Sequence, residues 1–175
     1  MAEQSFEQWF GGSKVVDDQG MPLVVYHGTL ASEPIDRFQG LESVGWFAES
    51  PKLAERYAST YVDFSGSIYA EEDAALYPVY LSIQRPLRLD FDMNDPADVA
   101  LAVAKELGVG LAGGYEAHEV INDSRIMAAA LKAGYDGIQV QEDGVWTWAP
   151  LSSDQIRHAS EVDREHQASR ERVRA

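Results

Sequence analysis

Candidate catalytic or binding residues lie at the end of an apolar run, in the segment VVYHGT at residues 24–29. His27 places an imidazole where this run stops, and Gly28 supplies backbone freedom beside it. A strand that simply runs into a turn would explain the same residues without any chemistry. Two other stretches therefore decide the interpretation: GWFAESPKLAERYA at residues 45–58 and the acidic QEDG at residues 141–144.

Several kinds of site are excluded by what the chain lacks. With no Cys, it has no disulfides, thiolate metal sites or cysteine nucleophiles. No G-x-S-x-G motif is present, and the glycine-rich GVGLAGGY at residues 108–115 does not fit a phosphate loop. No histidine pairs with an acid or a second histidine at metal-ligand spacing, so no metal site is predicted; the four are His27, His118, His158 and His166.

Composition predicts one globular domain in the cytoplasm. The 175 residues are 45% hydrophobic and 25% charged, with a net charge of −15 that disfavours a general nucleic-acid surface. No apolar run is long enough to span a membrane, and the acidic N-terminus does not resemble a secretory signal. We expect a monomer with a domain at residues 1–160 and a charged tail, helical or disordered, at 161–175.

The elements that must position these residues form an irregular mixture of strands and helices. A short helix is expected at Gln4–Phe10, and a strand ends at His27. Ser50 and Pro51 are a natural N-cap and first helical residue, and they open a helix that carries Tyr57 on an apolar stripe. Residues 63–75 are expected to form a surface loop.

The second half of the chain continues the mixture. Strands are predicted at 76–83 and 86–91, and helices at 95–108 and 116–134. A β-hairpin follows at 135–150 with Asp143 and Gly144 at its turn, and the chain becomes helical from Ser153. Without a regular βαβ alternation, the fold class is α+β.

Four blocks in this order resemble the ADP-ribosyltransferase fold, in the branch of diphtheria toxin and the poly(ADP-ribose) polymerases. The nearest likeness is to the ADP-ribosyltransferase domains of phage and prophage polyvalent proteins. The first block runs from Phe6 to Thr29, and in the second Trp46 precedes Tyr57 by eleven residues. KAGYDGIQV at 132–140 and SSDQIRHA at 152–159 match the closing blocks. The resemblance implies split antiparallel β-sheets with flanking helices around an NAD-binding cleft.

The resemblance also implies roles for individual residues toward NAD+, the co-substrate. His27 would hold ribose hydroxyls, with Thr29 helping on the adenosine side. Tyr57 and Trp46 would sandwich the flat, cationic nicotinamide ring. The backbone at Gly28 would meet the carboxamide, since no Cβ stands in the way. The cofactor-binding set is Tyr26, His27, Gly28, Thr29, Trp46, Phe47 and Tyr57.

The sequence departs from the family pattern at the catalytic acid. The usual glutamate position falls on Val145 or Thr147, and neither is an acid. The resemblance to phage-encoded relatives implies an acid at an earlier place, so Glu142, three residues before Val145, is the candidate. A carboxylate there would stabilise positive charge on the ribose. The alternative is that Glu142 and Asp143 are exposed turn residues. The catalytic set is His27, Tyr57 and Glu142.

The function implied is that of a mono-ADP-ribosyltransferase that modifies a macromolecule, a protein rather than a nucleic acid, and releases nicotinamide. Such a glycosyl-transferring enzyme would suit an effector or toxin-like role in a phage or prophage. One alternative is a catalytically silent module that binds NAD or ADP-ribose. Another is an NAD+-dependent RNA 2′-phosphotransferase, which the acidic balance of the chain disfavours.

Overall fold

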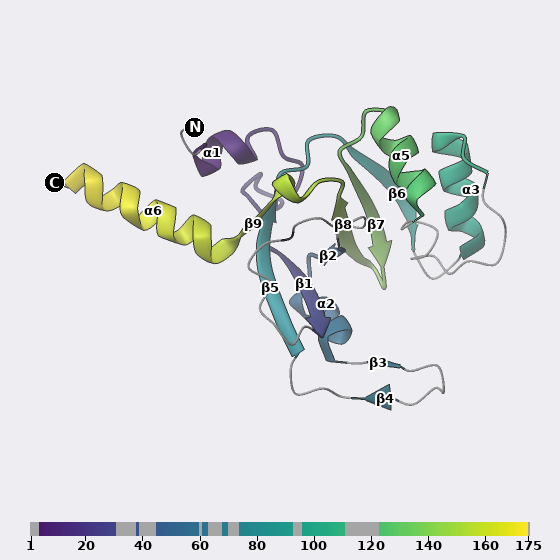
Figure 1. Ribbon diagram of the computed structural model, residues 1–175, viewed down its shortest axis with the longest axis horizontal. Helices are drawn as coiled ribbons and strands as arrows, with labels where there is room; N and C mark the ends of the chain where they lie inside the picture. Colours follow the sequence, from purple (N-terminus) through teal and green to yellow (C-terminus); the bar gives the residue numbers. More distant parts are fainter. Residues whose placement is uncertain are drawn as a thin grey trace.

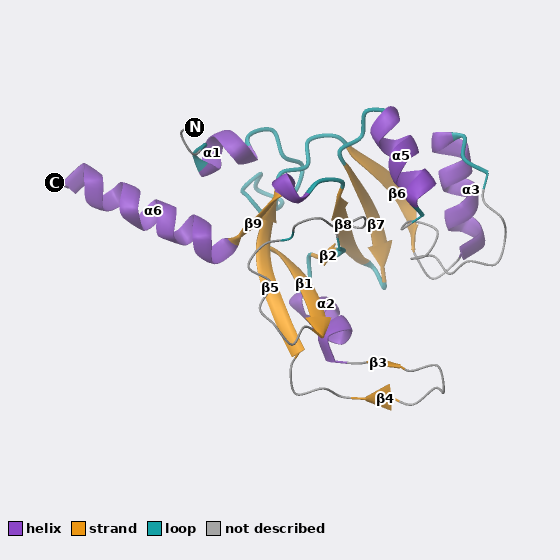
Figure 2. Ribbon diagram, viewed as in Figure 1, coloured by secondary structure: helices purple, strands orange, loops and turns teal. Residues whose placement is uncertain are grey.

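Figure 1 shows the chain as a computed structural model, which describes residues 4–30, 38, 45–59, 61–62, 68–69, 74–92, 96–110 and 123–174. Strands and helices are intermixed, as Figure 2 shows by colour, and the class is the expected α+β. The helices are α1 (Phe6–Phe10), α2 (Pro51–Ser59), α3 (Pro96–Leu107), α5 (Ser124–Lys132) and α6 (Ala159–Arg174). The predicted helix at 116–134 is thus seen from Ser124 onward, and its residues 116–122 lie outside the described part.

A seven-stranded sheet forms the centre of the molecule, in the order β6-β7-β8-β2-β1-β5-β9. Neighbours are antiparallel except for the parallel pair β6 and β7. Only the two-residue β2 lies between the half built from β6, β7 and β8 and the half built from β1, β5 and β9. The strands are β1 (Val25–Leu30), β2 (Phe47–Ala48), β5 (Ala74–Leu81), β6 (Pro86–Asp92), β7 (Gly137–Glu142), β8 (Val145–Pro150) and β9 (Ile156–His158).

Two short strands lie outside this sheet. β3 (Tyr61–Val62) pairs with β4 (Ile68–Tyr69) in a separate hairpin below the main body in Figure 1. We expected residues 63–75 to be a loop, and that prediction is wrong for β4 and for the first residues of β5. Strands of two residues have too little hydrophobic alternation to be recognised in a sequence.

Helices α3 and α5 cover one face of the β6–β8 half. Their contact with the sheet is a fully apolar cluster, made of Leu87, Leu89, Val103, Ile126, Ile138, Val140 and Ala149. Ile138 and Val140 alternate along β7, so both point to this face, and so does the next alternate residue, Glu142. The packing of α3 and α5 therefore determines which way Glu142 points.

The two ends of the chain pack together at the other edge of the sheet. Phe6 and Phe10 of α1 contact Val162 of α6 and the ring of Tyr80 on β5. Val162 is only 1% exposed, so the first turns of α6 belong to the folded body before the helix extends away from it (Figure 1). Our prediction that the chain is helical from Ser153 is wrong for β9, which pairs with β5 at the sheet edge.

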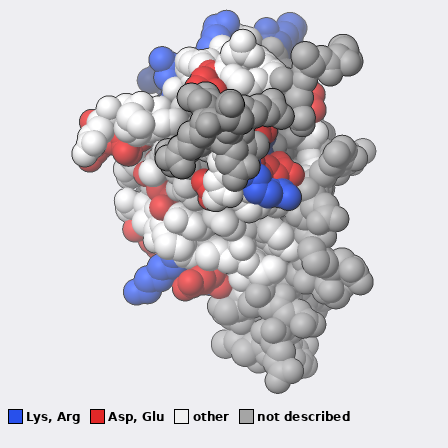
Figure 3. All heavy atoms as spheres, turned by 90° about the vertical axis from the view of Figure 1, so that its left-hand side faces the viewer, with Lys and Arg blue, Asp and Glu red and all other residues white. Residues whose placement is uncertain are grey.

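Figure 3 shows how acidic side chains are distributed on one face of the described part of the chain. On the face drawn in Figure 3, acidic side chains are scattered among neutral ones instead of forming one patch. Among the helices that the structure describes, none is both long and apolar enough to pass through a membrane.

Candidate functional site

A cavity of about 320 Å³ lies where β1, β2, α2 and the tip of the β7–β8 hairpin meet. Six of the eight residues predicted for the site line it, although they come from segments far apart in the sequence. The described lining residues are Tyr26, His27, Gly28, Gly45, Trp46, Ala48, Ala54, Tyr57, Glu142 and Thr147. Sequence reasoning did not assign Gly45, Ala48, Ala54 and Thr147 to the site, although the first three lie in the block at residues 45–58 and Thr147 is one of the two positions considered for the family glutamate.

His27 on β1 is held in one orientation. Its Nδ1 lies 2.9 Å from the carbonyl oxygen of Trp46, and because a carbonyl only accepts, Nδ1 carries the proton. Burial lowers the pKa of His27 below its usual value of 6.5, against the opposing effect of this hydrogen bond. Near neutral pH the ring is therefore uncharged, with Nε2 as an acceptor. Such an acceptor suits a hydroxyl group of a sugar.

Gly45 and Phe47 support the same ring. A Cβ on Gly45 would stand 2.6 Å from Cε1 of His27, so only glycine lets the backbone pass this close. Phe47 is completely buried, and its ring centre lies 5.3 Å from that of His27. We expected Phe47 to contact the cofactor, but it does not line the cavity and instead packs behind His27 in the core.

Gly28 allows helix α2 to pack directly against strand β1. A Cβ at this position would fall 1.7 Å from the carbonyl oxygen of Ala54, so the helix backbone occupies the space that any side chain would need. The sequence suggested that Gly28 makes room for a ligand, whereas the structure gives it a packing role first. This close approach brings Tyr57, one turn further along α2, to the rim of the cavity.

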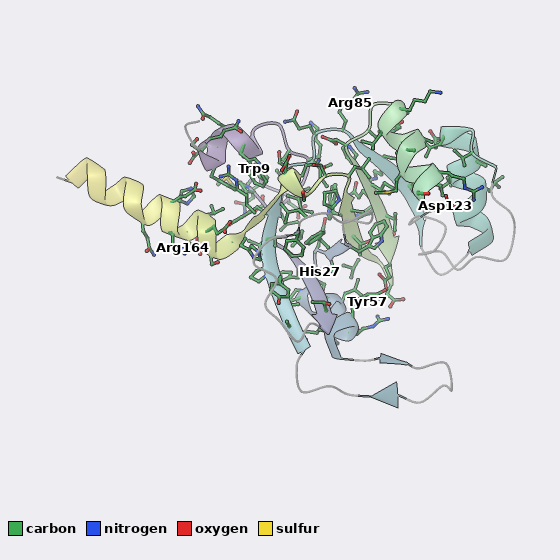
Figure 4. The ribbon with its side chains drawn as sticks, in the orientation of Figure 1. Trp9, His27, Tyr57, Arg85, Asp123 and Arg164 are labelled. Carbon is green, nitrogen blue, oxygen red and sulfur yellow. The ribbon has the colours of Figure 1, made fainter. Side chains whose placement is uncertain are left out.

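Tyr57 and Glu142 meet across the cavity. The Tyr57 hydroxyl donates a hydrogen bond to the Glu142 carboxylate. Glu142 is only 8% exposed, whereas the Tyr57 residue is 54% exposed. Burial of the hydroxyl, and then its bond to Glu142, raise the pKa of Tyr57, so the group stays a proton donor. Figure 4 shows Tyr57 and His27 on the neighbouring elements α2 and β1.

The turn after Glu142 has the geometry that its sequence predicts. Asp143 and Gly144 have φ angles of 51° and 75°, and positive values at both central residues define a type I′ hairpin turn. Asp143 is exposed and forms an ion pair with Arg56 of α2. Adjacent residues thus differ: Glu142 is buried at the cavity, and Asp143 faces solvent.

Of the remaining residues predicted for the site, some line the cavity and one does not. Tyr26 and Trp46 line the cavity, and Trp46 also packs against the apolar cluster under α3 and α5. Thr29 lies further along β1, opposite Ala75, and is not among the described residues that line the cavity. A second hollow, of about 430 Å³ beside Trp9, contains none of the predicted residues.

One comparison with known proteins assigns the chain to a family. A family model described as "ADP-ribosyltransferase in polyvalent proteins" matches residues 17–165, which include every residue that lines the cavity. Searches of curated proteins and of solved structures gave no match. The match extends over most of the chain and includes β1, α2 and the β7–β8 hairpin. The chain therefore belongs to the ADP-ribosyltransferase family of polyvalent proteins.

Proposed function

We propose that the chain binds NAD+ in this cavity and transfers its ADP-ribose group to a protein, with release of nicotinamide. The observation that carries this proposal is the meeting of His27, Tyr57 and Glu142, from three separate elements, at one cavity. A volume of about 320 Å³ is at the low end for small-molecule sites, so the cavity would take the nicotinamide end of a dinucleotide.

Each of the three side chains has a distinct task in this proposal. The Nε2 atom of His27 accepts a hydrogen bond from a ribose hydroxyl. The half-exposed ring of Tyr57 stacks on the nicotinamide. The buried carboxylate of Glu142 stabilises the positive charge that builds on the ribose as the bond to nicotinamide breaks.

The transfer conserves atoms and charge without any further reagent. The carbon–nitrogen bond between ribose and nicotinamide breaks, and its electron pair leaves with nicotinamide as a neutral molecule. A nucleophilic side chain of the acceptor forms the new bond to the same ribose carbon and loses its proton. Because the reaction develops charge in a confined site, one fixed carboxylate makes a large difference to its rate.

The test is the substitution Glu142→Gln, which keeps the volume of the side chain and an oxygen that can accept from Tyr57. We expect nearly unchanged NAD+ affinity by calorimetry and a roughly 10²–10³-fold lower rate of nicotinamide release, the usual cost of removing one electrostatic stabiliser. Glu106→Gln, an exposed acid on α3, is the matched control. Labelled NAD+ added to a bacterial lysate would identify the modified protein. An unchanged rate in Glu142→Gln would show that the catalytic group lies elsewhere.

A catalytically silent binding module is the second candidate, and one observation favours it. No acid stands at Val145 or Thr147, where the family pattern places its glutamate, and the Glu142 carboxylate is already bonded to Tyr57. NAD+ binding by the native chain without nicotinamide release would establish this alternative. Transfer of the phosphate group of a 2′-phosphorylated RNA to the ADP-ribose of NAD+, with loss of nicotinamide, would instead point to a phosphotransferase.

A further inference from the structure

Two side-chain contacts join the end of α2 to the tip of the β7–β8 hairpin. Tyr57 donates to Glu142, and its neighbour Arg56 pairs with Asp143. Consecutive residues of the helix thus bind consecutive residues of the hairpin. The inner contact faces the cavity and the outer one faces solvent, and both attach the hairpin tip to α2.

The outer contact contributes little to folding. The Arg56 and Asp143 side chains are 59% and 45% exposed, and ion pairs this open to water are screened and add little stability. The inner contact is different, because Glu142 is buried and its orientation decides where a negative charge lies in the cavity. A weak surface pair beside a buried carboxylate has more influence on position than on stability.

Glu142 lies at the end of the ladder between β7 and β8. Glu142 and Val145 form the last paired position of β7 and β8, and beyond it only Asp143 and Gly144 close the turn. Both turn residues have positive φ angles, and the exposed Asp143 side chain meets Arg56 of α2. The ion pair at Asp143 therefore restrains the backbone one residue away from the Glu142 carboxylate.

From this geometry we infer that Arg56 is a positioning residue, whose ion pair with Asp143 holds the hairpin tip against α2 and so keeps the Glu142 carboxylate at the cavity. The expected effect of Arg56 on the reaction rate rests on the proposed function. The attachment of the hairpin tip to α2 is a property of the folded chain and does not depend on that function. Arg56 itself does not contact the substrate in this scheme.

Kinetics of NAD+ consumption test the effect on rate. Arg56→Gln and Asp143→Asn each lower kcat about tenfold with KM nearly unchanged, because a displaced carboxylate loses much of its effect on the transition state. Asn is as well suited as Asp to the turn, so Asp143→Asn removes the charge and keeps the backbone. Arg56→Lys keeps the positive charge and retains most of kcat. Lys52→Gln, an exposed cation one turn earlier on α2, is the matched control and leaves kcat unchanged.

Hydrogen–deuterium exchange tests the hold on the hairpin without reference to activity. Amides of residues 142–146 exchange faster in Arg56→Gln than in the native chain or in Lys52→Gln. Equal exchange in all three proteins would overturn the inference. So would a raised KM with unchanged kcat, since Arg56 would then bind the substrate directly. A native chain that releases no nicotinamide but shows the exchange difference would refute the proposed function and keep the hold on the hairpin.

Discussion

Replacing Gly28 by Ala tests the contact that places Tyr57 at the cavity. The added Cβ would stand 1.7 Å from the carbonyl oxygen of Ala54, and an ordinary contact begins at 3.4 Å. Helix α2 must therefore retreat from β1 by at least about 1.7 Å at this point. The retreat loosens the buried packing of Leu53 and Ala58, and overpacking of this kind costs roughly 1–3 kcal/mol.

The consequence has two measurable parts. At about 2–4 °C per kcal/mol for a chain of this size, the melting temperature of the free protein falls by roughly 2–12 °C. Because Tyr57 moves with the helix, nicotinamide release falls about 10²-fold, as expected when a binding group shifts by more than 1 Å. Gly110→Ala is the matched control, since a Cβ there meets no atom within 4 Å among the residues that the structure describes. If Gly28→Ala melts like the native chain and only loses NAD+ affinity, the free side of Gly28 faces the ligand, and our packing argument is wrong.

Two more predictions concern the cavity. Tyr57→Ala weakens NAD+ binding by roughly 1–3 kcal/mol in calorimetry, the usual value of lost stacking on a ring, whereas Tyr57→Phe keeps most of the affinity; equal losses would mean that the hydroxyl matters and the ring does not. Burial lowers the pKa of His27, so as the pH falls the unfolded chain binds a proton at this residue before the folded chain does. The contribution of His27 to the free energy of unfolding is therefore complete above about pH 6.5 and is lost as the pH falls through the lowered pKa. His27→Gln flattens this part of the stability curve in urea unfolding at several pH values, and an equally steep curve would assign the decline to other groups.

Local signals in the sequence were sufficient where one or two residues determine the backbone. Ser50 and Pro51 mark the start of α2, and the structure begins that helix at Pro51. Asp143 and Gly144 predict a hairpin turn, and both have the positive φ angles that it needs. The order of the four family blocks then indicated which segments meet at the site.

Features that depend on contacts between distant parts of the chain could not be predicted from these local sequence signals. The parallel pairing of β6 with β7 depends on how α3 and α5 pack, and no local pattern records it. β9 is three residues long and precedes a charged helix, so its alternation is too short to recognise. Arg56 reads as an ordinary surface residue because its partner is 87 positions away. Phe47 stands beside site residues in the sequence, yet strand alternation turns its ring into the core.

The sheet is joined across its middle by side chains more than by backbone hydrogen bonds. β1 and β2 share one paired position, Tyr26 opposite Ala48, and the buried ring of Phe47 packs with side chains of both β1 and β8. Apolar packing yields to small displacements more easily than a hydrogen-bonded ladder, whose register changes only by whole residues. We therefore expect any relative movement of the two halves to occur at β2, within the limits set by the contacts of Tyr57 and Arg56 with the hairpin tip. A ligand that touches Tyr26 on one half and Thr147 on the other would add a further link between them, so we expect it to make their unfolding more cooperative.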